Sequence, residues 1–440
     1  MIEFAPKTRV LLIGAGARVK NNYLPVLTGM SDLIEIVGIH SRTPERLRLV
    51  AEAWNVKPVF DLEGVDFDGV DLVAASVPTP QNAVVMRKLL PNAARIGLVL
   101  DTPVAGSTAQ LAEQAALARH FRQVSITEDY MNFPKFELVR EAVRRGIVGR
   151  PKSLTLYNIG YRHHGLALIR SFTGFQAVVG QSRLALSAGA DVISYRFADG
   201  FVGHVVGPYR RHSTGGLLLE GEDGLISEFP VDRKLLGSKP AYVLAPVNGP
   251  SGIEGHRISG PGQDIMVDQP LLRAMRSMSF DDKSDMNLER GCGLAQVFLH
   301  AMGHHNINRG YGISQAWYDS FGPRLAMKAD VAPKTLDAYS LETLAGVSVS
   351  NHEAASEPPS PVSSTRLVAK VATALKRGLA RAVTFSDPDR RAVQAGDQLL
   401  ACTEPAERNH LKLTSVTLSD IPLEGIWYIS GPAWEEKPIA

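Results

Sequence analysis

The sequence predicts an α/β protein in which an N-terminal domain with a doubly wound parallel sheet precedes an α+β domain with a mostly antiparallel, open sheet. Three observations support this fold class. A strand runs into a glycine turn at residues 8–19, apolar runs alternate with helical patterns up to about residue 130, and later strand-like runs are broken by Gly and Asp as in hairpins. The length of 440 residues exceeds what one core usually serves.

Five apolar runs predict the strands of the first sheet, and three helical patterns lie between them. The strands are expected at Arg9–Ile13, Ile34–Ile39, Leu72–Ser76, Ile96–Leu100 and Gln123–Thr127. The helices are expected at Pro44–Trp54, Gln81–Leu90 and Thr108–His120. Strands with few polar residues fit a parallel sheet that is buried on both faces.

The pattern changes after Pro134. A helix at Phe136–Arg145 and a strand at Lys152–Tyr157 are expected, then several strands between residues 184 and 229, and helices at Gln269–Met278 and Leu288–Asn308. The predicted division is a dinucleotide-binding domain at 1–132, a substrate and oligomerisation domain at 133–347, a Ser/Pro-rich linker at 348–365 and an extension at 366–440. The extension, a helix plus strands, is expected to pack on the second domain. Its basic helix at Arg366–Arg381 leaves a role in binding a protein partner open.

Composition excludes several classes of protein. The chain has 47 Lys and Arg against 45 Asp and Glu, a net charge of +2 that does not indicate a nucleic-acid binder. Its two cysteines are far apart, so neither a disulfide framework nor a zinc knuckle is expected. No apolar run approaches the roughly 20 residues of a membrane span. We therefore expect a cytoplasmic protein without nucleic-acid or membrane partners.

The glycine turn at residues 14–18 predicts a dinucleotide site of the Rossmann type. Gly14 permits the tight turn, and Gly16 lets the backbone approach phosphate oxygens, with the amides through Ala17 and Arg18 at a helix N-terminus. Val19 replaces the third glycine of the usual pattern. An ordinary strand–helix turn would explain the pattern without a ligand, but the flanking strands favour a cofactor.

The end of the second strand distinguishes the two nicotinamide cofactors. The residues there are Ser41, Arg42 and Thr43, with no carboxylate before Glu45. Arg42 can bind a 2′-phosphate and the hydroxyls can add hydrogen bonds, so NADP is preferred over NAD. If Arg42 is only a solvated loop charge, NAD remains possible.

Five features in one order resemble the glucose–fructose oxidoreductase, inositol dehydrogenase and rhizopine-catabolism (Gfo/Idh/MocA) family. They are the glycine turn, the segments at residues 39–43, 76–82 and 100–104, and the run at residues 128–134. The resemblance covers residues 8–230. It implies an NAD(P)-dependent enzyme for small molecules, whose open second sheet packs against another subunit in a homo-oligomer. It also places Val77 and Pro78 beside the nicotinamide ribose.

The chain departs from the family pattern after the fifth strand. Where the family has Glu-Lys-Pro, this chain has Asp101, Thr102 and Pro103, so the lysine that contacts substrate and cofactor is missing. Thr102 cannot carry a positive charge. Asn82 stands where many members have a histidine. By resemblance, Asp101, Pro103 and Asn82 are still expected at the cofactor, and Asp101 and Thr102 at the reaction centre.

A proton donor remains available at the start of a later helix. Alignment back from Gly174 puts His164 on the family's histidine and Gly160 on its aspartate. His164 is our candidate acid–base residue, with Tyr161 and His163 as alternatives. The two histidines could instead be a polar helix start at the domain interface.

These residues predict an NAD(P)-dependent oxidoreductase that acts on a sugar-derived, imine or conjugated C=C or C=N substrate. The alternatives are a non-catalytic cofactor-binding or partner-binding homologue, and a non-redox lyase with bound NAD. His300, His304 and His305 resemble a metal motif, but no nearby carboxylate or cysteine completes the set. We therefore expect no metal ion.

Overall fold

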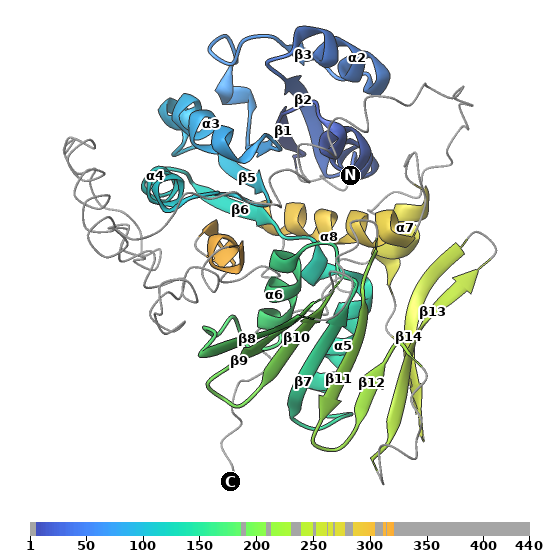
Figure 1. Cartoon of the computed structure of the whole chain (residues 1–440). Helices are drawn as coiled ribbons and strands as arrows, with labels where there is room; N and C mark the ends of the chain where they lie inside the picture. The colour runs from blue at the N-terminus through green and yellow to red at the C-terminus, as the bar shows by residue number, and fades with distance from the viewer. Residues whose placement is uncertain are drawn as a thin grey trace, which may run out of the picture.

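The computed structural model contains two sheets, with helices between and around them (Figure 1). The structure describes residues 6–185, 191–207, 213–229, 239–249, 252–261, 263–266, 269–277, 285–303, 311–313 and 315–320. A six-stranded sheet is formed by the first part of the chain and a nine-stranded sheet by the second. The predicted fold class is thereby confirmed.

The first sheet is parallel throughout, with the strand order β3-β2-β1-β4-β5-β6. Its strands are β1 (Thr8–Ile13), β2 (Ile34–His40), β3 (Pro58–Val59), β4 (Leu72–Ala75), β5 (Gly97–Asp101) and β6 (Gln123–Thr127). All five predicted strands are present. Strand β3 was not predicted, because two residues are too few to give a pattern. The order reverses between β1 and β4, which is where open α/β sheets bind ligands.

Both faces of this sheet are covered, and alternate residues of β1 divide between them. Leu11 and Ile13 join a core with α3 and α4, whereas Val10 and Leu12 join a core with α1, α2 and α8. The helices that follow these strands are α1 (Leu24–Gly29), α2 (Pro44–Trp54), α3 (Asn82–Leu89) and α4 (Thr108–Ala118). Short turns of 3-10 helix lie at Phe67–Gly69, Thr79–Gln81, Leu90–Asn92 and Tyr130–Asn132, the last labelled η5.

The second sheet has the order β15-β14-β13-β12-β11-β7-β10-β9-β8. Its strands are β7 (Pro151–Tyr157), β8 (Gly180–Ala185), β9 (Asp191–Arg196), β10 (Val202–Val206), β11 (Gly216–Gly221), β12 (Leu225–Ser227), β13 (Ala241–Gly249), β14 (Gly252–Gly260) and β15 (Gln263–Met266). Six of the eight neighbouring pairs are antiparallel, and the β7–β10 and β12–β13 pairs are parallel. The sheet is therefore mostly antiparallel, as predicted, but mixed.

Among the described residues, this sheet is accompanied by the helices α5 (Pro134–Arg144), α6 (Arg162–Ser171), α7 (Pro270–Ser277) and α8 (Asp285–Ala301). Helices α5 and α6 lie near the sheet, and α8 runs between the two sheets (Figure 1). Although α8 comes late in the chain, it contacts β5, β6 and α1 of the first domain. It begins earlier than the predicted Leu288–Asn308 and stops at Ala301, shortly before Gly303 takes a left-handed φ of 81°.

Several predictions fall on residues outside this description. They are the linker at 348–365, the extension at 366–440 with its basic helix, and the histidines at 304 and 305. The division at residue 132 stays a prediction. Among the helices that the structure describes, none is both long and apolar enough to cross a membrane.

Candidate nicotinamide and substrate site

The glycine turn follows β1 and leaves its backbone open. Gly14 has a φ of 120°, and a Cβ atom there would lie 2.2 Å from the carbonyl oxygen of Ser76, so only glycine fits. Around Gly16, a Cβ atom would meet nothing within 4 Å. Gly14 therefore allows β1 and β4 to approach closely, while Gly16 leaves room for a phosphate to reach the main chain.

The helix after the turn begins at Val19, whose side chain is buried. Residues Val19–Tyr23 form one π-helical turn before α1, and the amide of Lys20 donates to the carbonyl of Gly16 at 3.0 Å. A Cβ atom on Gly14 would lie 3.5 Å from the Val19 side chain. The valine thus packs behind the turn, where the usual pattern has its third glycine, and the helix is locally widened.

The residues predicted to choose the cofactor lie on the loop between β2 and α2. Arg42 and Thr43 are exposed, and Ser41 is half-buried. The amide of Thr43 donates to the hydroxyl of Ser41 at 3.4 Å, and α2 begins at Pro44. Arg42 is therefore on an exposed part of this loop, and its role toward a 2′-phosphate stays a prediction.

Asp101 joins the ends of three neighbouring strands. Its carboxylate accepts hydrogen bonds from the hydroxyls of Ser76, after β4, and Thr127, at the end of β6, each at 2.7 Å. It also lies 3.5 Å from the guanidinium of Arg18. Asp101 therefore holds this edge of the sheet together, and its direct roles toward cofactor and substrate remain predictions.

The loop after β5 is held by side chains from the segment between β4 and the start of α3. The Asn82 amide donates to the carbonyl of Val104 at 2.9 Å, and the Thr79 hydroxyl donates to the carbonyl of Pro103 at 3.0 Å. Asn82 is buried, whereas Thr102 is half-buried at the end of β5. Of the nearby candidates, Val77 is half-buried and Pro78 is exposed. Asn82 thus supports the loop, and a contact with the cofactor is still untested.

Arg18 connects the glycine turn to the segment that leaves the first domain. Its guanidinium lies 2.7 Å from the carboxylate of Asp129, which follows β6. Arg290 of α8 approaches the same carboxylate at 3.8 Å. The two arginines hold the pKa of Asp129 below its usual range, although burial opposes them. Asp129 thus connects the glycine turn to α8 by an ion pair with one arginine from each.

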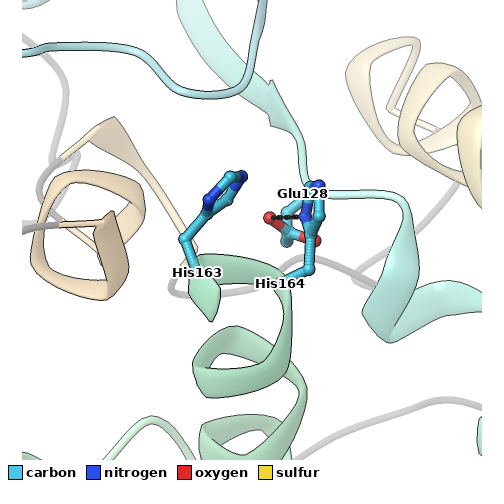
Figure 2. A group of neighbouring side chains, drawn as sticks. All are labelled: Glu128, His163 and His164. Carbon is cyan, nitrogen blue, oxygen red and sulfur yellow. Dashed lines mark hydrogen bonds and ion pairs between the residues drawn. The ribbon is translucent and has the colours of Figure 1, made fainter. Parts of the chain in front are cut away.

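A buried carboxylate–imidazole pair lies next to this ion pair. Nδ1 of His164, in the first turn of α6, lies 2.7 and 2.9 Å from the two carboxylate oxygens of Glu128. Glu128 comes directly after β6, and its carboxylate faces the imidazole of His164 (Figure 2). Both residues are buried. Sequence reasoning selected His164 but not its partner. A glutamate at the carboxyl end of a parallel strand was the available signal, since sites gather at that edge.

Burial shifts both groups toward their neutral forms. Burial and the neighbouring Asp129 raise the pKa of Glu128 well above its usual range. The pKa of His164 is lowered to about 3, chiefly by burial and also by Arg290 and Arg18. Both directions describe a pair that shares one proton and carries no net charge at neutral pH. Such a pair can give a proton to a substrate or take one from it.

Tyr130 fixes the ring of His164 and explains why residue 160 is glycine. The tyrosine ring stacks on His164, with centroids 4.4 Å apart, and on Phe133, with centroids 4.6 Å apart. Its hydroxyl donates to the carbonyl of Ser213 at 3.1 Å. A Cβ atom on Gly160 would lie 2.2 Å from that hydroxyl. The place of an aspartate side chain at position 160 is thus taken by Tyr130, which the sequence analysis missed as a site residue.

The two alternative donors lie beside His164 on the same helix start. The ring of Tyr161 stacks near His163 with centroids 5.6 Å apart, and the two histidine rings are 4.1 Å apart. All three come from the N-terminal end of α6 or the residue before it. His300, the other histidine that the sequence singled out among the described residues, lies in the last turn of α8. Figure 2 shows both imidazoles rising from α6 beside Glu128.

Residues 8–128 match the model of the Gfo/Idh/MocA family, an oxidoreductase family with an NAD-binding Rossmann fold. The match covers the glycine turn and all six parallel strands, and it confirms the resemblance stated from the sequence. Fold and match together indicate the class of protein: residues 8–128 are similar to this family of NAD-binding oxidoreductases. Among curated protein sequences, none matches the chain.

Solved structures of similar fold extend the comparison to the second domain. An oxidoreductase from Thermotoga maritima shares 16% identity, with a TM-score of 0.51 over 76% of this chain and 98% of its own. An oxidoreductase from Agrobacterium radiobacter in complex with NAD+, L-tartaric acid and magnesium shares 14%, with a TM-score of 0.51 over 71% and 93%. A levoglucosan dehydrogenase in complex with NADH and levoglucosan shares 12%, with a TM-score of 0.52 over 72% and 95%. At these identities the likeness shows the shared fold.

Proposed function

We propose that this protein transfers hydride between a nicotinamide cofactor and a small polar organic substrate, with the Glu128–His164 pair as acid–base group. The observation that carries this proposal is the position of the pair. Glu128 directly follows the last strand of the Rossmann sheet, and the adjacent Asp129 forms an ion pair with Arg18 of the glycine turn. A dinucleotide held at the turn would extend along this same edge toward the pair.

The chemistry follows from the single shared proton. In the reductive direction, hydride adds to a C=O, C=N or conjugated C=C bond and the imidazole of His164 delivers the balancing proton. Glu128 holds the ring in place and accommodates the proton at Nδ1. In the oxidative direction, the same pair accepts the hydroxyl or amine proton. Tyr161 and His163 are the nearest alternative donors, and Thr102, at the end of β5, would contact the substrate.

We favour NADP over NAD, because the loop after β2 presents Arg42 with Ser41 and Thr43 and no carboxylate before Glu45. A guanidinium can hold a 2′-phosphate by two charge-assisted hydrogen bonds. The diphosphate would bind at the amides of residues 14–18, and the nicotinamide would lie near Val77, Pro78 and Pro103. Levoglucosan and tartaric acid, bound by two proteins of this fold, support a hydroxylated or carboxylated small molecule as substrate.

The decisive experiment measures cofactor binding and turnover separately. Calorimetry with NADPH and with NADH should show binding, tighter for the phosphorylated form. Absorbance of the reduced nicotinamide should then fall when carbonyl, imine and enone substrates are supplied. Binding without any turnover, together with co-purification of another enzyme, would favour the non-catalytic alternative. Turnover without net change of the cofactor would favour a lyase, and no binding of either cofactor would refute the proposal.

A further inference from the structure

We propose that Glu128, His163 and His164 form a binding site for a divalent transition metal ion, with zinc as the best match. The site shares Glu128 and His164 with the proposed reaction, but zinc binding can be tested without turnover. The proposal departs from the expectation that the chain binds no metal. That expectation considered only the histidines at positions 300, 304 and 305 and their neighbours in sequence. Glu128 and His164 are 36 positions apart in sequence and come together only in the folded chain.

The three side chains already converge. One ligand atom from each residue lies within 4.8 Å of the ligand atoms of the other two. With metal–ligand bonds of about 2.0 to 2.1 Å, ligand atoms around a tetrahedral zinc ion are roughly 3.3 Å apart. Small rotations of the side chains would therefore close the set around an ion. The shortest separation, 2.7 Å between Glu128 and His164, would open slightly as the metal replaces the proton.

The type of ligand favours zinc over magnesium or calcium. Two imidazole nitrogens with one carboxylate suit a borderline transition metal, whereas the hard alkaline-earth ions prefer sets made of oxygen. Three protein ligands leave a fourth position of a tetrahedral ion open. Glu128 and His164 are buried and His163 is half-buried. In such an arrangement the protein surrounds most of the ion, and one coordination position is left for water or a substrate.

The surrounding charges leave the carboxylate of Glu128 available for a cation. Both nearby guanidiniums, Arg18 and Arg290, are directed to Asp129 at 2.7 and 3.8 Å. Glu128 is instead bonded to the imidazole of His164. A divalent ion would supply a full counter-charge to this buried carboxylate. Asp129 would offset the repulsion that the two arginines exert on the ion.

Metal binding is coupled to the loss of protons. An ion binds a deprotonated carboxylate and an imidazole nitrogen that carries no proton. The proton that the pair shares must leave when the ion enters. Binding should therefore release protons and weaken as the pH falls. At the open position, the ion would hold a substrate oxygen and stabilise negative charge that develops there.

The test titrates zinc into the full-length protein after treatment with a chelator, without nicotinamide or substrate. Calorimetry should show one ion per chain, and the measured heat should depend on the ionisation enthalpy of the buffer because protons are released. Cobalt should compete for the same site and give visible absorption bands of a four- or five-coordinate centre.

The main variant is His163→Ala, because this residue is half-buried and its loss should leave the fold intact. Loss of one ligand should weaken zinc binding at least about tenfold. His163→Cys keeps a ligand that zinc accepts and should retain binding. Glu128→Gln should also weaken binding, with far-ultraviolet circular dichroism as the check on folding. The matched control is His300→Ala, which removes a histidine of the motif near the end of α8 and should bind zinc as the natural sequence does.

Two results would overturn the metal site. One is the absence of a stoichiometric ion in the chelator-treated protein after titration, and the other is unchanged zinc affinity in folded His163→Ala. Neither result bears on hydride transfer, which is measured with NADPH in the absence of metal. Conversely, zinc binding that depends on His163, in a protein that never turns over nicotinamide, would support the metal site and refute the oxidoreductase proposal.

Discussion

At the scale of single residues, the candidate site is organised by pairs that lie far apart in the sequence. Asp101 binds hydroxyls from two other strand ends, and Asp129 binds an arginine from each side of the domain boundary. Glu128 binds His164 in the same region. Each of these three carboxyl groups thus has a specific partner, as the cost of burying a polar group requires.

Replacing His164 with Ala should lower kcat by about 10² to 10⁴-fold, the usual contribution of a general acid–base group. NADPH affinity should change little, because the phosphates bind at the glycine turn. Between pH 5 and pH 8 the rate of the natural protein should also show no inflection at the pKa of free histidine, because burial lowers the pKa of His164 to about 3.

Stopped-flow and steady-state assays across that pH range measure both quantities. His120→Ala removes an exposed histidine after α4 and serves as the control. A His164→Ala protein that retains full kcat would show that the catalytic assignment is wrong. An inflection near the pKa of free histidine would contradict the account of the shared proton.

Replacing Arg42 with Ala should weaken NADPH binding by roughly 10 to 100-fold, because a hydrogen bond to a charged group contributes about 1.5 to 3 kcal/mol. NADH affinity should not change. Calorimetry with both cofactors measures the selectivity directly. The exposed Arg46, four positions later in α2, provides the matched control as Arg46→Ala. Equal losses for NADPH and NADH would instead place Arg42 near the adenine.

At the scale of elements, helix α5 contributes polar side chains to the packing between the second sheet and α8. Burial raises the pKa of Glu137 to about 7, although Arg140 and a hydrogen bond from Gln296 of α8 oppose the shift. One turn later, Arg144 and Arg145 hold the pKa of Glu141 below its usual range. The same helix therefore carries two glutamates whose folded-state pKa values move in opposite directions.

This contrast predicts opposite pH dependences. A raised pKa means that the stabilisation by protonated Glu137 is complete below about pH 4.5 and is lost as the pH rises through about 7. The Tm of the natural protein, compared with Glu137→Gln, should therefore fall across that range. The Tm of the natural protein, compared with Glu141→Gln, should instead fall on acidification, because a lowered pKa gives a stabilisation that is lost as the pH falls. Scanning calorimetry from pH 4.5 to pH 8.5 checks the difference for Glu137, and scans continued below pH 4.5 check the difference for Glu141. A difference in Tm that does not change with pH in its own range would refute that assignment.

Local patterns predicted the elements well, and the reasons are visible in particular segments. Helix α2 has its predicted bounds because Pro44 starts it and Asn55 ends it in a left-handed conformation. The glycine turn was predictable because its residues are consecutive. The Glu128–His164 pair and the Tyr130 hydroxyl against Gly160 were not, because these contacts form only when β6 and α6 are brought together. Helix α8 resembled any apolar helix, and nothing local showed that it returns to the first sheet.

At the scale of the whole molecule, the nine-stranded sheet offers a surface for self-association. Large apolar side chains are exposed on it at Leu184, Val243 and Met266, by 64%, 44% and 59%. Sheets with exposed apolar residues tend to bury them against a partner. We therefore expect the homo-oligomer that the family resemblance implies, with this sheet at the interface.

Sedimentation equilibrium should give a mass of two or more chains. Val243→Asp, on the strand β13, should shift the protein toward monomer, because an interface would bury the new charge. Leu49→Asp alters an exposed apolar residue of α2, away from the second sheet, and should leave the mass unchanged. A natural protein that sediments as a monomer would exclude the oligomer, and an unaffected Val243→Asp would exclude this interface.

The path of α8 has a consequence for how the chain is made. The inner face of the first sheet, lined by Val10, Leu12 and Val99, packs in one core with residues of α8 such as Leu294 and Phe298. During synthesis that helix leaves the ribosome only after more than half of the polypeptide. Until then α1 and α2 cover only part of this apolar face, so we expect the nascent first domain to expose the rest and to be prone to aggregation until α8 is made.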